Sequence, residues 1–243
     1  MSDLNDSPWG LYDPEQEHSS CGVGFITRKD GKQKHEVLKK GHEALCAVPH
    51  RGGMSSEGVG DGAGISVDLS VELFSRLTGA ELEKGRFGVG NFFMPENSAY
   101  HERAIALVED TLAAANMPVL LRREVPVDEK AIESRGLKHQ LPIIQWVFSA
   151  PEGVEGAKLD QLVYETLLLI EATAYTDPDL TGLYPLSLSV HTQVFKGRLN
   201  SWEIVPYFQD LSDPDHAVHT LFFHTRFSTN TDPHPSMAQP FRL

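Results

Sequence analysis

The chain has 243 residues, a formal net charge of −13 and 40% hydrophobic residues, which is enough apolar material for a globular core. The excess of acidic groups argues against a nucleic-acid-binding protein, because neutralising phosphates requires basic surface. The most apolar stretch, residues 167–170, lies between Glu165 and Glu171. It is far shorter than the ~20 residues of a membrane span. We therefore expect neither nucleic acid nor a membrane as a partner.

The first twenty residues form an acidic leader. They lack the basic and apolar regions of a secretory signal. With two cysteines in the chain and no such signal, a reducing cytoplasm is the expected location. These residues alone favour a disordered tail over a removable propeptide. The leader has no Lys or Arg, and its carboxylates are Asp3, Asp6, Asp13, Glu15 and Glu17.

Cys21 follows the leader directly. If the leader were removed, the free α-amino group of Cys21, with a pKa near ~8, would stand beside a thiol with a pKa near ~8.5. The amine could then accept the thiol proton and leave a thiolate to attack a carbonyl carbon. Cys46, by contrast, follows Leu45 in a helical pattern and is expected to be a packed core thiol.

Strand-like and helix-like stretches alternate after Cys21, which predicts one layered α/β or α+β domain. Periodicity alone leaves open whether the sheets are parallel. The expected strands are 21–27, 87–94, 119–125, 143–149, 187–195 and 217–227. The expected helices are 37–48, 97–115 and 159–175, with a short polar helix between the third and fourth strands. On the last long helix we expect the buried side to carry Leu162, Tyr164, Leu167, Leu168 and Ile170.

A glycine-rich loop, HRGGMSSEGVGDGAG, spans residues 50–64. It lacks the Lys-Ser/Thr ending of a P-loop and the spacing of a dinucleotide fingerprint, so a nucleotide site is weakly supported. So much glycine is typical of backbone that runs close to another group. The histidines near the end of the chain show no zinc-ribbon spacing, and we predict no metal site.

The segment HTRFSTNTDPHPSMAQPFRL begins at His224. Arg226 would stand at a strand end, with Ser228, Thr229 and Asn230 close behind it. An arginine fork beside hydroxyl and amide donors suits the α-carboxylate of an amino acid. A structural ion pair is the alternative interpretation of Arg226.

Three sets of strings occur together and in order: LYDPEQEHSS before CGVGFI, HRGG with GDGAGI, and HTRFSTNT with AQPFRL. Over residues 9–243 the chain thereby resembles the amino-terminal glutamine amidotransferase domain of bacterial glutamate synthase large subunits. The resemblance implies an α+β fold, the four-layer αββα sandwich of amino-terminal nucleophile hydrolases, with antiparallel sheets. It also implies that residues 1–20 are a propeptide and residues 21–243 the amidotransferase domain.

The same resemblance implies roles for individual residues. Cys21 would attack the side-chain amide of L-glutamine and release ammonia through a γ-glutamyl thioester, with its own freed amine as the base. Arg226 would bind the α-carboxylate of glutamine, and Thr229 would line the same pocket. Arg51 would help to organise the loop around Cys21. Residues 61–64 would pack near the site without a catalytic role.

By resemblance, the ammonia passes through a tunnel to a synthase domain of the same polypeptide. That domain converts 2-oxoglutarate to glutamate on FMN and an iron–sulfur cluster, with electrons from NADPH or ferredoxin. None of these cofactors is expected within the present residues. A small, electron-supplying subunit is the expected partner in the NADPH-dependent type.

The chain departs from the family pattern at its end. In the family, AQPFRL runs into AHNGEIN, whose Asn-Gly pair supplies the oxyanion hole, whereas this sequence stops at Leu243. We therefore expect the fold to be incomplete at the C-terminus and the chain alone to have little or no glutaminase activity. A truncated, non-catalytic domain with an interaction or regulatory role is the alternative. A phosphoribosyl or hexosamine-phosphate type of amidotransferase is disfavoured, because those relatives usually begin almost directly at the cysteine.

Overall fold

The computed structural model describes residues 22–48, 58–132, 134–225, 234–238 and 240. Its strands form two four-stranded sheets, and every neighbouring pair is antiparallel. The strands are β1 (Gly22–Thr27), β2 (Ala63–Asp68), β3 (Phe87–Phe93), β4 (Val119–Glu124), β5 (Ile143–Ser149), β6 (Tyr184–Ser189), β7 (Thr192–Gly197) and β8 (Thr220–Thr225). The first sheet has the order β1-β8-β2-β7 and the second β4-β5-β3-β6. The α+β class and the antiparallel sheets are thereby confirmed.

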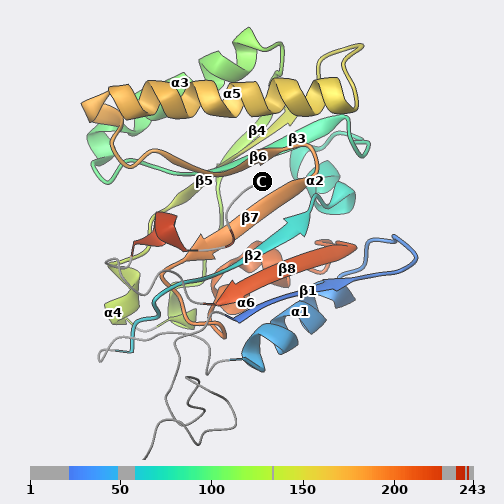
Figure 1. The fold of residues 1–243 in the computed structure, drawn as a ribbon, viewed down its shortest axis with the longest axis vertical. Helices are drawn as coiled ribbons and strands as arrows, with labels where there is room; N and C mark the ends of the chain where they lie inside the picture. Colours follow the sequence, from blue (N-terminus) through green and yellow to red (C-terminus); the bar gives the residue numbers. More distant parts are fainter. Residues whose placement is uncertain (1–21, 49–57, 133, 226–233, 239, 241–243) are drawn as a thin grey trace, which may run out of the picture.

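Helices flank the two sheets (Figure 1). The long helices α3 and α5 run together along the second sheet, and α1 packs against β1 and β8 of the first. The helices are α1 (Glu36–Cys46), α2 (Val71–Thr78), α3 (His101–Ala114), α4 (Ser134–Leu137), α5 (Ala157–Thr176), α6 (Ile204–Tyr207) and α7 (Gln209–Ser212). Short 3₁₀ turns are η2 (Ser98–Tyr100), η3 (Glu129–Ala131), η4 (Pro178–Leu180) and η5 (Pro235–Met237). Among the described helices, none combines the length and apolarity needed to cross a membrane.

A large apolar core lies between the second sheet and helices α3 and α5. Trp146 is fully buried there, meets Phe92 edge-on at a ring distance of 5.4 Å, and donates its indole N–H to Glu109. Burying one such side chain is worth roughly 1.5–3 kcal/mol. The polar end of the ring is therefore satisfied while its apolar body holds the helix layer on the sheet.

Buried amides join the two sheets. Asn91 of β3 donates to the carbonyl oxygen of Val194 on β7 at 3.0 Å. Gln145 of β5 donates to the side-chain oxygens of Asn91 at 2.9 Å and Gln193 at 3.2 Å. Buried amides are costly without partners, so this network favours a single arrangement of the two sheets relative to each other.

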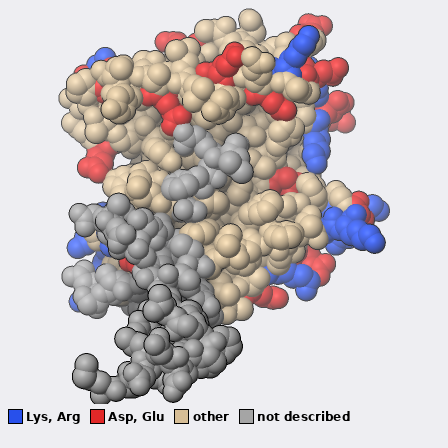
Figure 2. All heavy atoms as spheres, viewed as in Figure 1, with Lys and Arg blue, Asp and Glu red and all other residues tan. Residues whose placement is uncertain are grey.

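Charged and uncharged residues are unevenly distributed on the face drawn in Figure 2. Acidic side chains gather at the top, over the long helices, whereas uncharged residues fill the middle.

Some apolar residues of the first sheet are exposed: Val23 is 74% and Phe25 64% accessible, and the Phe25 ring lies 5.7 Å from that of Phe222. Part of this sheet therefore presents apolar side chains to solvent.

Most expected elements are confirmed with small shifts of their ends, but the buried side of α5 was partly mispredicted. Leu167 and Ile170 are buried as expected. Tyr164 and Leu168 are exposed, and Leu162 is only half-buried. The helix carries apolar residues on most of its circumference, so periodicity could not select the side that faces the sheet.

The single strand predicted for residues 187–195 is wrong. The chain turns between β6 and β7, which belong to different sheets. Ser189 makes the turn, because its hydroxyl oxygen accepts from the backbone N–H groups of His191 at 3.0 Å and Thr192 at 3.3 Å. A serine turn of this kind carries no Gly or Pro signal. The structure also adds α2, and β2 begins inside the predicted loop 50–64.

Candidate active site

Four strand ends meet at one edge of the first sheet. Gly22 begins β1 and pairs with Thr225, which ends β8. Thr225 also pairs with Ala63, which begins β2, and Ala63 pairs with Gly197, which ends β7. We call Gly22, Thr225, Ala63 and Gly197 the strand-end row. The segments that connect to these four residues therefore all join the sheet at one edge.

The predicted residues Cys21, Arg51, Arg226 and Thr229 lie outside the described part of the chain. Two of them are bonded to the strand-end row, since Cys21 precedes Gly22 and Arg226 follows Thr225. Bonded neighbours have Cα atoms ~3.8 Å apart. The structure thus pairs the immediate chain neighbours of Cys21 and Arg226.

The end of the glycine-rich loop passes very close to the residues that follow β7. A Cβ atom on Gly60 would come within 2.3 Å of the carbonyl carbon of Leu199 and 2.5 Å of the nitrogen of Asn200. Only glycine permits so close a backbone approach. The Asn200 side-chain amide also donates to the carbonyl oxygen of Gly58 at 3.1 Å. The expectation that this loop needs glycine for a close approach is confirmed at Gly60.

A second row of residues lies one position inside the strand-end row. Gly64 of β2 pairs with His224 on one side and Lys196 on the other. Lys196 is fully buried, yet its ammonium group donates to the carbonyl oxygen of Ser236 at 3.0 Å. The same Nζ atom lies 4.9 Å from the centre of the Tyr184 ring, where a cation is attracted to the π face. A carbonyl oxygen and an aromatic ring therefore both stabilise the buried cation.

His224 is buried beside Gly64. Burial lowers the pKa of its imidazole, so the neutral form is favoured. Among the described residues, no hydrogen-bond partner reaches the buried Nδ1 atom of His224. A neutral imidazole with an available ring nitrogen can accept or donate a hydrogen bond at this edge.

Sequence reasoning missed Lys196, Asn200 and His224 as neighbours of the site. The signal for Lys196 was a lone charge inside an apolar strand pattern. His224 stands two residues before Arg226 in the string HTRFST, which marks its place but not its burial. Asn200 carried no signal, because its partner Gly58 is distant in sequence.

A cavity of about 480 Å³ opens near this edge. Its basic lining residues include Lys138, Arg198 and His234, and Glu96 is its acidic one. A larger cavity of about 700 Å³ lies between α5 and β6. No residue of the strand-end row lines either cavity, but Arg198 of the smaller cavity directly follows Gly197, so the smaller cavity lies beside the row.

Metal-binding clusters were also searched for within the described ranges, and no group of three or more His, Cys, Asp or Glu side chains is placed to hold an ion. His219 instead lies with its Nδ1 atom 2.7 Å from a carboxylate oxygen of Asp68. Cys46 is partly buried, with its sulfur 3.7 Å from the ring nitrogens of His42, and burial raises the pKa of its thiol. Cys46 is thus a poor nucleophile at neutral pH.

Comparison with known proteins gives the family. The profile of the glutamine amidotransferases class-II matches residues 21–243. The chain is 34% identical to glutamate synthase [NADH] of Saccharomyces cerevisiae, over 96% of this chain and 11% of that protein. It is 34% identical to ferredoxin-dependent glutamate synthase 2 of Synechocystis sp., over 97% of this chain and 15% of that protein.

The glutamate synthase [NADPH] large chain of Azospirillum brasilense is 32% identical, over 96% of this chain and 16% of that protein. The chain thus spans 11–16% of the length of these relatives. The family match starts at Cys21, the residue that precedes the strand-end row. The chain belongs to the class-II glutamine amidotransferases.

Proposed function

We propose that Cys21 is an amino-terminal nucleophile that hydrolyses the side-chain amide of L-glutamine and supplies ammonia for glutamate synthesis from 2-oxoglutarate. The observation that carries this proposal is the pairing of Gly22 with Thr225 in a member of this family. Cys21 is bonded to the first residue of that pair and Arg226 to the second. A nucleophile and a carboxylate-binding arginine at one edge suit an amino-acid substrate.

The proposed reaction begins after removal of residues 1–20. The freed α-amino group of Cys21 takes the thiol proton, and the thiolate attacks the side-chain carbonyl carbon of glutamine. The tetrahedral intermediate collapses as the ammonium of Cys21 returns its proton to the leaving nitrogen, which releases ammonia and leaves a γ-glutamyl thioester. Water then attacks the thioester, the amine again assists, and glutamate leaves with the thiol restored.

Three further residues have roles in this proposal. Arg226 binds the α-carboxylate of glutamine through its planar fork. Thr229 lines the same pocket, and Arg51 organises the loop around Cys21. Support comes from the smaller cavity near the edge, whose basic lining suits a substrate with a carboxylate.

We extend the proposal to the architecture. The two antiparallel sheets, with α1 on one side and α3 and α5 on the other, support a four-layer αββα sandwich of the amino-terminal nucleophile type. In that arrangement residues 1–20 are the propeptide and residues 21–243 belong to the amidotransferase domain. The strand that begins at Gly22 then carries the nucleophile at its start.

The proposed partners follow from the relatives, whose names specify NADH, ferredoxin or NADPH. The ammonia is used by a synthase domain of the same polypeptide, in the cytoplasm, with FMN and an iron–sulfur cluster. Such a cluster is normally held by three or four cysteine thiolates, and this chain has two cysteines in all. The cluster therefore belongs to other residues, and a small subunit supplies electrons in the NADPH-dependent type.

Ammonia release from L-glutamine by a protein that carries the complete amidotransferase domain tests the proposal. Cys21→Ala is expected to lower the rate by a factor of about 10³ or more, because the nucleophile is lost. Cys46→Ala is the matched control and should leave the rate unchanged, since its thiol is partly buried with a raised pKa. An active Cys21→Ala variant would rule out the proposed nucleophile. A protein that retains its leader and releases no ammonia would favour the non-catalytic alternative.

A further inference from the structure

We infer that the smaller cavity is a binding site for a small oxyanion, a free carboxylate or phosphate, held by Arg198 with Lys138 and His234 beside it. We call this cavity, of about 480 Å³, the basic cavity. The proposed function needs one carboxylate partner, at Arg226. The basic cavity takes a second anion and thus goes beyond that function.

The basic cavity lies where segments from both sheets meet. Arg198 directly follows β7 of the first sheet. In the second sheet, Glu96 belongs to the loop after β3, and Pro142 directly precedes β5. Those two strand ends are paired, Phe93 with Ile143. Each wall therefore starts from a paired strand, so the two sheets set the positions of the walls.

Hydrogen bonds hold the walls of the basic cavity together. The side-chain amide of Gln140 donates to the carbonyl oxygen of Arg198 at 2.9 Å. Gly197 permits this approach, because a Cβ atom there would come within 2.7 Å of the side-chain oxygen of Gln140. On another wall, His101 donates through Nε2 to the carbonyl oxygen of Pro95 at 2.8 Å. The cavity is therefore formed before a ligand enters, as most small-molecule sites are.

Arg198 has a guanidinium nitrogen whose capacity to donate is unused. Its Nε atom is buried, and among the described residues no hydrogen-bond acceptor reaches it. A buried donor without an acceptor costs stability and calls for an explanation, such as a bound ion. The guanidinium keeps its charge, and its planar fork matches two oxygens of a carboxylate or phosphate. An oxyanion is therefore the acceptor that suits this side chain.

Two further donors line the basic cavity. Lys138 is exposed and carries an ammonium group with three N–H donors. The Nδ1 atom of His234 accepts from the backbone N–H of Ser236 at 3.3 Å, so the proton of the neutral ring is on Nε2. That Nε2 atom lies 3.8 Å from a carboxylate oxygen of Glu96, too far for a hydrogen bond. Because the Glu96 side chain is 75% exposed, water screens much of its repulsion of an anion.

The lining also limits the kind of ligand. The volume of the basic cavity lies within the range of small-molecule sites. Its described lining includes no Phe, Tyr or Trp, the side chains on which a nucleotide base would stack. The apolar part of the lining, which can contact a short carbon chain, consists of Pro95, Leu141, Pro142 and Pro235. A small carboxylate or inorganic phosphate therefore suits the cavity better than a nucleotide.

The basic cavity and the predicted binding residue for the glutamine carboxylate belong to different strands. Arg198 follows Gly197 of β7, and Arg226 follows Thr225 of β8. The strand β2 lies between them, since Ala63 pairs with both Gly197 and Thr225. Two strand spacings amount to ~10 Å. The two arginines therefore leave the sheet at different points, which gives room for two anions.

Isothermal titration calorimetry of the purified protein tests the site, with malonate and inorganic phosphate as probes in chloride buffer of constant ionic strength. We expect saturable binding of at least one probe. The tighter probe then identifies the source of the oxyanion, an organic carboxylate or free phosphate. Arg198→Gln should weaken this binding roughly 10-fold or more, because a charge-assisted hydrogen bond is lost. Lys138→Gln should weaken it less, since its exposed charge is screened.

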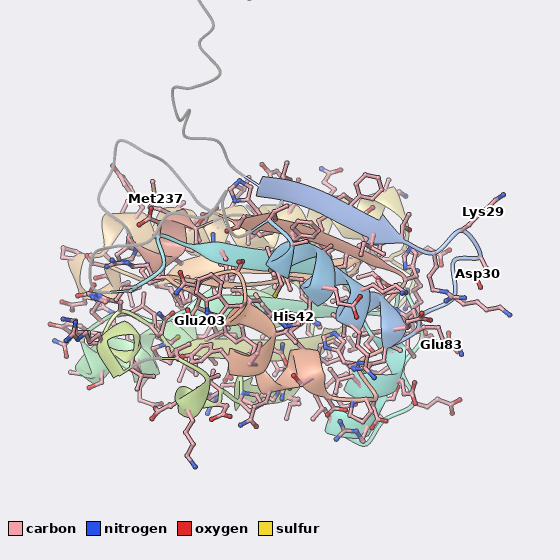
Figure 3. All side chains as sticks on the ribbon, turned by 90° about the horizontal axis from the view of Figure 1, so that it is seen from below. Lys29, Asp30, His42, Glu83, Glu203 and Met237 are labelled. Carbon is pink, nitrogen blue, oxygen red and sulfur yellow. The ribbon has the colours of Figure 1, made fainter. Side chains whose placement is uncertain are left out.

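Lys29→Gln is the matched control, because it also removes one positive charge, at an exposed position far from the basic cavity. Figure 3 shows Lys29 on the side of the molecule opposite Met237, which ends the turn η5 that begins with the cavity-lining Pro235. This variant should bind the probes as tightly as the wild type. Equal weakening in Lys29→Gln and Arg198→Gln would mean that net charge alone attracts the anions, and would overturn the inference.

Competition with L-glutamine separates the second site from the substrate site. Saturating L-glutamine should leave the affinity for the probe unchanged, and displacement of the probe would rule out a second site. Failure of both probes to bind also overturns the inference, whatever the glutaminase activity. A protein that binds a probe but releases no ammonia contradicts only the proposed function. If Arg198→Gln does not fold, Arg198→Lys carries the same test and should show an intermediate loss, because it keeps the charge without the planar fork.

Discussion

His216 shows how burial determines the chemistry of a single side chain. It is completely buried; its Nδ1–H donates to the carbonyl oxygen of Asp210 at 2.8 Å, and its Nε2 atom accepts from the amide of Gln193 at 3.3 Å. These two partners assign the tautomer. Burial lowers the pKa of His216, and this effect outweighs the opposing effect of the Asp210 carbonyl. The folded protein therefore holds this imidazole neutral.

The pH dependence of stability follows from that direction. In the unfolded chain a histidine takes up a proton near pH ~6.5, whereas folded His216 does so only at lower pH. Stability is therefore fully present above that pH and is lost as the pH falls toward the folded pKa. We expect the urea midpoint to drop between pH 7.5 and pH 5.5. His42 and His224 shift in the same direction because of burial.

A pair of variants isolates the contribution of His216. His216→Gln should show a smaller loss of stability on acidification than the wild type, because the titrating group is gone. His191→Gln is the control, since His191 is exposed and pairs with Asp160 at the surface. Equal pH slopes for His216→Gln and the wild type would contradict the assignment of a buried neutral imidazole.

The candidate site was only partly predictable at this scale. Cys21, Arg51, Arg226 and Thr229 came from motif strings and a resemblance, and they lie outside the described residues, so their roles stay predictions. The hydrogen bond from Lys196 to Ser236 could not be predicted, because the two residues are far apart in the sequence. The sequence predicts that Lys196 lies in a strand, but its burial depends on how the second sheet packs against the first.

At the scale of elements, the glycine-rich loop approaches the residues that follow β7 closely, and this approach gives a prediction for Gly60. In Gly60→Ala the new Cβ would meet backbone atoms of Leu199 and Asn200, which cannot swing aside as a side chain can. We expect a loss of about 1–3 kcal/mol in the free energy of unfolding, measured by urea denaturation.

The matched control for Gly60 is Gly136→Ala in α4. There the new Cβ would meet only the end of the Ile132 side chain, at an ordinary 3.8 Å. Replacing a helical glycine by alanine is favourable by roughly 0.5–1 kcal/mol, so this variant should be neutral or slightly stabilised. Equal losses in the two variants would show that the close approach at Gly60 is not what requires glycine.

Elements with strong periodic patterns were predicted well, and short or tightly turned ones were not. Strands such as Phe87–Phe93 and Ile143–Ser149 and the helix His101–Ala114 occur close to their expected bounds. The split between β6 and β7 was missed because apolar residues alternate through the turn and a serine hydroxyl forms it. Helix α2 was missed because it is only eight residues long.

Across the whole molecule, an ion pair joins the second sheet to the helices near the first. Arg123 of β4 makes two bonds to the Asp210 carboxylate on α7, and its Nε donates to the side chain of Gln145 at 2.8 Å. Both charged side chains are largely buried, at 16% and 6% accessibility. Removing one partner of a buried pair leaves the other charge without compensation.

We therefore expect Asp210→Asn to lower the free energy of unfolding by about 3 kcal/mol. Asp179→Asn is the control, because Asp179 pairs with the exposed Arg103 and such surface pairs are worth about 0–1 kcal/mol. Urea denaturation of both variants at neutral pH measures the difference. Equal losses would mean that the Arg123–Asp210 pair contributes no more than a surface contact.

The resemblance to a known family predicted the antiparallel sheets, and the composition of the chain did not. Periodicity predicted strands but could not pair them, because pairing depends on contacts between distant segments. The order β1-β8-β2-β7 places β1, which begins next to Cys21, beside β8, which ends next to Arg226, with β2 on the other side of β8. That topology brings the chain neighbours of Cys21 and Arg226 together at one end of the sheet.

The central claim is that Cys21 becomes the first residue and attacks glutamine. The most direct measurement is to treat the purified protein with an electrophilic analogue of L-glutamine, digest it, and locate the adduct by mass spectrometry. The account predicts one adduct, on Cys21 at a new N-terminus that lacks residues 1–20. An adduct on Cys46, or an unlabelled protein that retains its leader, would contradict it.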